Sequence, residues 1–170
     1  MTGPIEISPY AEANAFFRAM RRMAGWRPVS WLLARILPAT DRFVSRRTGN
    51  HLTFAGLATG LQVLMLTTTG ARTGTRRTQP VAYLGKSGDF ILIASNFGQE
   101  RNPAWYYNLR ANPSAQVTVS GSTCDVTARE VTGPERDLYW EQGCRMYPAW
   151  NLYKARSRRQ FPIMILSSAG

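Results

Sequence analysis

Residues that commonly bind metals or act as activated nucleophiles are scarce in this chain. Its 170 residues include one histidine, His51, and two cysteines, Cys124 and Cys144. A single histidine excludes sites built from several histidines and argues against a Ser-His-Asp triad. The cysteines lack metal-binding or redox spacing, and a disulfide is not expected in a cytosolic protein. The sequence therefore predicts no metal site and no histidine-activated nucleophile.

Long apolar runs are also missing. No stretch of about 18 apolar residues occurs, so no segment is expected to span a membrane. The N-terminal residues include Glu6 and Glu12 and lack the apolar core of a signal peptide. We therefore expect a cytoplasmic protein, with peripheral attachment to the inner face of the membrane left open.

Acidic residues are few compared with basic ones. The chain has 10 Asp and Glu against 21 Lys and Arg, a net charge of +11, and nearly all the basic residues are arginines. Such an excess implies an anionic partner, which could be nucleic acid, an acidic membrane surface or a polyanionic ligand. With 44% hydrophobic residues, the chain is long enough to bury a core. Charge alone does not choose among the three partners.

The chain divides near Gly49 into an N-terminal arm, residues 1–49, and a strand-rich domain, residues 50–170. In the arm, apolar residues recur at helical spacing and arginines occupy another face. The first apolar stripe consists of Ala13, Phe16, Phe17, Met20 and Met23, and the arginines beside it are Arg18, Arg21 and Arg22. Basic amphipathic helices of this kind lie in membrane interfaces. The alternative is that the stripes cover the domain that follows.

Six short strands are predicted after the arm, over 62–69, 76–85, 90–95, 115–120, 123–131 and 161–167. Asn102-Pro103 is predicted to cap one helix between them, and Thr132-x-x-Glu135 is a capping box that starts a second. This pattern predicts an α+β, mainly β fold, a partly open antiparallel barrel with appended helices.

The segment from Leu64 to Tyr83 contains a turn with glycines at Gly70 and Gly74 and arginines at 72, 76 and 77. Turn glycines permit tight backbone geometry, and guanidinium groups bind phosphate or carboxylate through paired hydrogen bonds. The turn is therefore predicted to be an anion-binding hairpin. The alternative, a solvated basic hairpin tip, stays open.

Three further clusters combine aromatic, amide and small residues. They are ASNFG at 94–98, NPAWYYNL at 102–109 and YPAWNLY at 147–153. Each cluster taken alone is more typical of core packing. Together with the arginine hairpin, they indicate a binding site.

In this order, the motifs resemble the deazaflavin-dependent nitroreductase family, split β-barrel oxidoreductases that use coenzyme F420. The resemblance covers residues 60–167 and more weakly 41–53, and it includes TTTGARTGTRRTQPV, the three clusters, Ala128-Arg129 and the closing R-x-F-P-I at 159–163. It implies that the hairpin holds the phosphate and acidic tail of the coenzyme, and that strand and turn residues line its ring. The implied cofactor-binding residues are Arg72, Thr73, Arg77, Pro80, Val81, Ala94, Ser95, Asn96, Gly98, Trp105 and Asn108. The implied substrate-binding residues are Ala82, Ser95, Tyr147, Trp150 and Tyr153.

The chain departs from the family pattern at Ala71, Ala82, Asn96 and Trp150. Trp150 stands where the quinone-reducing branch has a tyrosine proposed as proton donor, and an indole N–H is too weak an acid for that role. Tyr147 and Tyr153 are the remaining candidate donors, with water as the default.

The expected function is hydride transfer from reduced coenzyme F420 to a hydrophobic quinone, conjugated carbonyl or nitro compound. With no metal ligands and no nucleophile–base pair in the sequence, the protein supplies binding and orientation while the cofactor supplies the chemistry. One alternative is a split-barrel protein that binds flavin mononucleotide or lipid without catalysis. The other is a nucleic-acid-binding module, which is not expected because the arginines are divided between the arm and a turn.

Overall fold

The computed structural model describes residues 14–23, 25–26, 28–29, 32, 35, 61–86 and 88–168. Most of the arm beyond its first helix, including the 41–53 lead-in, lies outside the described residues. The division at Gly49 therefore stays a prediction.

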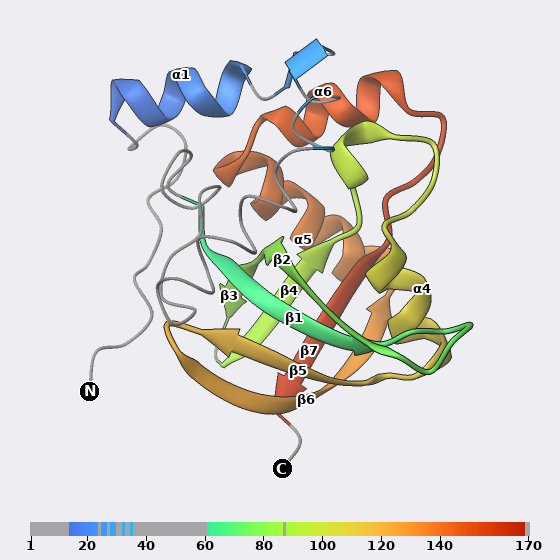
Figure 1. Cartoon of the computed structure of the whole chain (residues 1–170). Coiled ribbons are helices and arrows are strands. Elements are labelled where there is room, and N and C mark those ends of the chain that lie inside the picture. Colours follow the sequence, from blue (N-terminus) through green and yellow to red (C-terminus); the bar gives the residue numbers. More distant parts are fainter. Residues whose placement is uncertain are drawn as a thin grey trace.

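Seven antiparallel strands form one curled sheet (Figure 1). They are β1 (Val63–Thr69), β2 (Arg76–Ala82), β3 (Leu84–Lys86), β4 (Asp89–Ile93), β5 (Ser114–Val119), β6 (Ser122–Val131) and β7 (Ile163–Ser168). Their order in the sheet is β2-β1-β5-β6-β7-β4-β3. The mainly β, antiparallel fold predicted from the sequence is confirmed.

The predicted strand 76–85 is two strands in the structure, because this segment changes its partner. Up to Ala82 it pairs with β1, and Tyr83 still donates its N–H to the carbonyl of Gln62 at 3.1 Å. From Leu84 onward it pairs with β4, where Leu84 lies opposite Ile91. One extended segment therefore joins the two edges of the sheet, which curls the sheet toward a barrel.

Helices occupy the connections between strands. α4 (Ala104–Ala111) lies between β4 and β5 in the chain, and α5 (Gly133–Met146) and α6 (Ala149–Arg156) lie between β6 and β7. Both predicted helix starts are correct to within two residues. The capping is different, because neither Pro103 before α4 nor Thr132 before α5 makes a side-chain cap hydrogen bond. The Glu135 carboxylate pairs with Arg129 at 2.7 Å.

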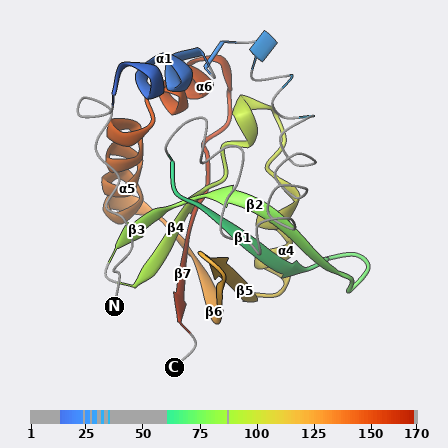
Figure 2. The ribbon, with the colours of Figure 1, turned by 60° about the vertical axis from the view of Figure 1, so that its left-hand side comes forward.

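Two clusters of buried side chains make up the core, one on each face of the central strands. In β7, Met164 and Leu166 belong to the cluster that includes α4, whereas Ile163 and Ile165 belong to the cluster beneath α5 and α6. Alternate residues of a strand point to opposite faces, so a central strand covered on both sides is apolar throughout. Helices α5 and α6 thus cover one face, and α4 closes the other (Figure 2).

The described helix of the arm, α1 (Ala15–Met23), lies beside α6 and away from the sheet (Figures 1 and 2). Its apolar side chains are only partly covered, since Phe16 is 61% exposed and Met23 is 54% exposed. Trp26, just beyond the helix, is 67% exposed. The part of the chain that the structure describes therefore leaves these three apolar side chains uncovered. Among the described helices, none combines the length and apolar character needed to cross a membrane.

Candidate functional site

The hairpin turn, Gly70–Thr75, connects β1 to β2 after the last strand pair, Thr69 with Arg76. Gly70 and Thr75 are joined by an N–H···O bond of 2.9 Å, and Gly74 donates to the Gly70 carbonyl at 2.8 Å. Gly74 has φ = 65°, a left-handed conformation that glycine adopts without strain. The side chains of Arg72, Thr73 and Arg77, all predicted to bind the cofactor, are exposed here.

Asn108 fastens this turn to the body of the protein. Its side chain is 7% exposed and comes from α4, on the core side of β1. Its Oδ1 accepts a hydrogen bond from the Ala71 N–H at 3.0 Å, and its Nδ2 donates to Thr68 Oγ1 at 2.9 Å. Because the amide is buried and both its ends are bonded, it fixes where the turn begins. Asn108, predicted to belong to the cofactor site, thus braces the start of the hairpin turn.

The third arginine of the hairpin, Arg76, is engaged elsewhere. It donates to Gln116 Oε1 on β5, and Gln116 in turn donates to Asp125 Oδ1 at 2.8 Å on β6. This chain of polar contacts runs over the outer surface of the sheet. Of the hairpin arginines, Arg76 is therefore the one that bonds a neighbouring strand in the part of the chain that the structure describes.

The predicted ring-lining residues of β2 divide between its two faces. Val81 is buried in the core cluster that also contains Ala94 and Trp105. Pro80 and Ala82 share the opposite face and are half-buried. Proline is tolerated at position 80 because β2 is an edge strand of the sheet. On its outer side there is no neighbouring strand, so the N–H that proline lacks would have no sheet partner there.

The segment Ser95–Gly98, called here the 95–98 turn, follows β4 and has an unusual backbone. Ser95 is right-handed helical, whereas Asn96, Phe97 and Gly98 have φ of 47°, 55° and 77°. A right-handed residue followed by a left-handed one turns successive N–H groups toward a common point, which suits a negatively polarised oxygen. Ser95 and Gly98, both predicted to bind the cofactor, lie in this turn, and their own N–H groups donate to the carbonyls of Ile93 at 2.8 Å and Ser95 at 2.9 Å.

Two arginines that the sequence analysis gave no role hold this segment. Arg159 donates to the carbonyl oxygens of Ala94 at 3.1 Å, Ser95 at 2.8 Å and Gln99 at 2.8 Å, and also to Asn102 Oδ1. Arg156 donates to the Phe97 carbonyl at 2.9 Å. The signal for Arg159 was its place at the start of the closing R-x-F-P-I motif. Arg156 carries no such signal.

The aromatic set of the third cluster lies inside the protein. Tyr147, Trp150 and Tyr153 are 7%, 5% and 1% exposed. The two tyrosine hydroxyls are 3.2 Å apart, and the Trp150 indole N–H donates to Ser95 Oγ at 3.2 Å. Burial raises the pKa of Tyr153, and the Tyr147 hydrogen bond and the nearby Arg156 charge oppose that rise only in part. The set therefore contacts the 95–98 turn, through the bond of Trp150 to Ser95 and the packing of Tyr153 against Phe97.

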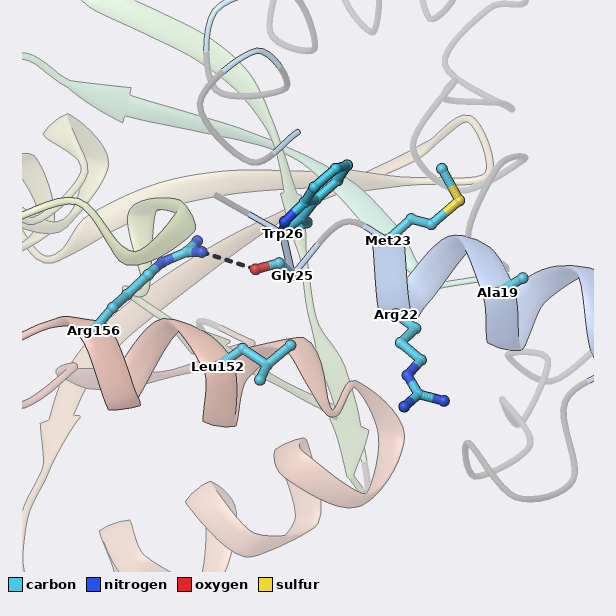
Figure 3. Close-up of a pocket in the computed structure, with 7 residues that line it drawn as sticks. All are labelled: Ala19, Arg22, Met23, Gly25, Trp26, Leu152 and Arg156. Atoms are coloured by element: carbon cyan, nitrogen blue, oxygen red, sulfur yellow. Dashed lines mark hydrogen bonds between the residues drawn. The ribbon is translucent and has the colours of Figure 1, made fainter. Parts of the chain in front are cut away.

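A groove of about 640 Å³ lies between α1 and α6 (Figure 3). Its lining is mainly apolar, and it includes Ala19, Met23, Trp26 and Leu152, with Arg22 and Arg156. None of the residues predicted for cofactor or substrate binding lines it. Among the described residues, no group of His, Cys, Asp and Glu side chains is arranged to hold a metal ion.

Comparison with known proteins gives consistent matches in sequence and in structure. Residues 39–168 match the family described as F420H(2)-dependent quinone reductase. An F420H(2)-dependent quinone reductase of Mycobacterium tuberculosis strain H37Rv is 31% identical over 147 residues, which cover 83% of this chain and 93% of the relative. A solved structure described as an F420-H2 dependent reductase, FDR-A, is 33% identical with a TM-score of 0.58, over 62% of this chain and 94% of that chain. Another solved chain, described as a domain-swapped dimer, is 27% identical with a TM-score of 0.60, over 83% of this chain and all of that one.

Proposed function

The chain belongs to the F420H(2)-dependent quinone reductase family, and from this premise we propose that it transfers a hydride from reduced coenzyme F420 to a hydrophobic quinone. Conjugated carbonyl and nitro compounds are further acceptors of the same electronic type. The protein is an oxidoreductase with a split-barrel-like fold, and its cofactor is coenzyme F420, with flavin mononucleotide the disfavoured alternative.

The hairpin turn is the observation that carries this proposal. Arg72 and Arg77 are exposed on a turn whose start is fixed by the buried Asn108. Two guanidinium groups held on a braced turn suit the phosphate and carboxylates of the coenzyme tail. The donor set therefore fits the cofactor, and we assign tail binding to Arg72, Thr73 and Arg77.

We assign ring binding to the region between β2 and the 95–98 turn. Pro80 offers an apolar wall next to the backbone of Val81, and the 95–98 turn brings the backbone of Ser95, Asn96 and Gly98 to the ring. When bound and reduced, coenzyme F420 supplies the hydride. The residues of this chain orient the ring, and the buried Ala94 and Trp105 support the wall from the core.

The proton that must accompany the hydride does not come from Trp150 in this proposal. Its indole N–H already donates to Ser95 Oγ, and an indole is too weak an acid to be a donor. Tyr153 is fully buried with a raised pKa, so it contributes through its hydroxyl contact with Tyr147. Tyr147 or water is the proposed donor. Ala82 and Ser95 complete the substrate side.

Reduced coenzyme F420, mixed with the protein and a quinone bearing a long apolar chain, is expected to be oxidised. An enone and a nitroaromatic compound, tested in parallel, rank the acceptors, and mixtures lacking the protein or the acceptor are the controls. Appearance of the oxidised deazaflavin chromophore is the measurement. If the protein binds the coenzyme but oxidises it with none of the three acceptors, it is a carrier and the proposal is wrong.

Replacing Trp150 by phenylalanine is expected to lower turnover by less than about tenfold, because it removes one neutral hydrogen bond. The pH–rate profile should keep every titrating step of the wild type, since no proton donor is lost. Tyr147→Phe is the matched comparison, and a missing step in its profile identifies the donor. A several-hundredfold loss confined to Trp150→Phe would contradict the assignment of proton transfer to Tyr147 or water.

We also propose that the arm binds an anionic membrane surface, where a hydrophobic quinone resides. Phe16 and Met23 on α1 and the neighbouring Trp26 are exposed, and Arg18 and Arg22 are exposed on the same helix. Each arginine near an acidic bilayer contributes about 1 kcal/mol, and exposed apolar side chains add insertion energy. The cytoplasmic location stays a prediction.

Co-sedimentation with vesicles that contain anionic lipid tests this second proposal. The wild type is expected to sediment with the vesicles at low salt and to be released as salt is raised, because surface charges are screened beyond about 10 Å. Arg18→Glu/Arg22→Glu should abolish binding, whereas Arg145→Glu/Arg158→Glu, with the same net charge, should retain it. If the two double variants bind equally well, or if the wild type does not bind, the arm is not a membrane-binding segment and its apolar stripes serve to cover the domain that follows.

A further inference from the structure

The 95–98 turn has a backbone that its own sequence does not favour. Asn96 and Phe97 are left-handed, at φ of 47° and 55°; asparagine tolerates that conformation, but the bulky Phe97 disfavours it. Within the turn, backbone hydrogen bonds join Gly98 N–H to the Ser95 carbonyl at 2.9 Å and Gln99 N–H to the Asn96 carbonyl at 3.0 Å. A segment strained in this way persists when its surroundings hold it.

Arg159 supplies much of that hold. One guanidinium donates to three backbone carbonyls, of Ala94, Ser95 and Gln99, and to the Asn102 side chain, so it grips both ends of the turn. Its charge lies 4.4 Å from the centre of the Phe161 ring, and no carboxylate among the described residues pairs with it. Burial lowers the pKa of Arg159, because removal from water disfavours the charged guanidinium.

Arg156 holds the middle of the same turn and links it to the arm. Its two terminal nitrogens donate to the Phe97 carbonyl at 2.9 Å and to the Gly25 carbonyl at 2.8 Å, the latter shown in Figure 3. The fit is close, because a Cβ on Gly98 would lie 2.9 Å from Arg156 Nε. The guanidinium also stacks over the Tyr153 ring, with Cζ 4.7 Å from the ring centre.

We propose that Arg159 and Arg156 are positioning residues for coenzyme F420: by holding the carbonyls of Ser95 and Phe97, they fix the backbone of the 95–98 turn in the conformation that meets the deazaflavin ring. Neither guanidinium needs to touch the cofactor for this role. The inference rests on the proposed function, because it takes the 95–98 turn as part of the ring site.

Arg159→Ala, Arg159→Lys and Arg156→Ala test the proposal, with Arg158→Ala as the matched control. Arg158 is adjacent and exposed, and it makes no hydrogen bond or ion pair with the part of the chain that the structure describes. Coenzyme F420 is titrated by fluorescence quenching at a temperature where every variant is folded. Hydrogen exchange of residues 94–102 is measured in the protein without cofactor.

Arg159→Ala is expected to weaken cofactor binding by about tenfold or more, since it removes several charge-assisted hydrogen bonds at once. Exchange in 94–102 should accelerate in the same variant. Arg159→Lys keeps the charge but not the planar fork, so its loss should be intermediate. Arg156→Ala should accelerate exchange around Phe97. Arg158→Ala should match the wild type in both measurements.

The results separate a positioning role from a merely structural one. A structural role predicts a lower melting temperature with unchanged cofactor affinity in the folded variants, and that result overturns the proposal. If Arg159→Ala does not fold, the Arg159→Lys variant is the test. If Arg159→Lys binds coenzyme F420 as tightly as the wild type and shows wild-type hydrogen exchange, the proposal is also overturned. If the wild type itself fails to bind coenzyme F420, the proposed function fails, and with it the cofactor role of the two arginines. Exchange then still decides whether they hold the turn.

Discussion

Replacing Asn108 by leucine is expected to destabilise the protein and to weaken coenzyme binding together. Leucine has a similar volume but cannot bond Thr68 Oγ1, which is buried, or the Ala71 N–H at the start of the hairpin turn. Each group left unsatisfied costs about 1–3 kcal/mol, so the free energy of unfolding should fall by roughly 2–4 kcal/mol. Because the hairpin turn would no longer be bonded to α4 at Ala71, the affinity of the protein for coenzyme F420 should also fall about tenfold. Thermal unfolding and fluorescence titration measure the two effects.

Asn112→Leu is the control for this substitution. Asn112 is the residue after the same helix, and its Oδ1 accepts a local hydrogen bond from the Ser114 N–H at 3.1 Å in an exposed position. Water replaces such a bond at little cost, so the control should lose well under half as much stability and no affinity. Equal losses in the two variants would show that Asn108 does not brace the turn.

Replacing Arg77 by alanine is expected to reduce affinity for coenzyme F420 by about ten- to hundredfold. The loss corresponds to one charge-assisted hydrogen bond, of roughly 1.5–3 kcal/mol, to the phosphate or carboxylates of the tail. Arg77 is exposed on β2 opposite Thr68, so its removal should leave the melting temperature nearly unchanged. Fluorescence quenching by the coenzyme and by flavin mononucleotide gives both affinities.

The matched control here is Arg145→Ala. Arg145 is exposed on α5, where it lies 3.5 Å from the Glu141 carboxylate, and its loss changes the net charge by the same amount. If Arg145→Ala weakens binding as much as Arg77→Ala does, the attraction is a general effect of the positive charge. Preference of the wild type for flavin mononucleotide would show that the hairpin does not select the deazaflavin.

Local sequence signals were sufficient for the strands and for most helix positions. The glycine-rich turn between Thr69 and Arg76 marks where β1 ends and β2 begins. Alternating or continuous apolar runs mark the strands, whose partners in most cases are neighbours in the sequence. The division of the 76–85 strand at Tyr83 was not predictable in this way, because the change of partner depends on how far the whole sheet curls. No local pattern carries that information.

The candidate site was predictable as a set of motifs but not as an arrangement. Asn102 was expected to cap α4, yet its side chain accepts from Arg159, which is 57 residues away in the sequence. Trp150 and Tyr153 are predicted to bind substrate, but their spacing alone did not show that both side chains are buried or that the Trp150 indole bonds the Ser95 hydroxyl. Spacing identifies which residues share a helix face. Spacing does not show which loop the shared helix face will pack against in the folded protein.

The position of β7 has a consequence for how the protein is made. This strand is the last of the seven in chain order but lies inside the sheet, between β6 and β4. During synthesis, β4 and β6 therefore leave the ribosome long before the strand that joins them. Each exposes an unpaired edge until Ser168 has emerged, and such edges pair readily with other chains. We expect nascent chains to depend on chaperones during this interval, and folding of the sheet to finish only after β7 has been released.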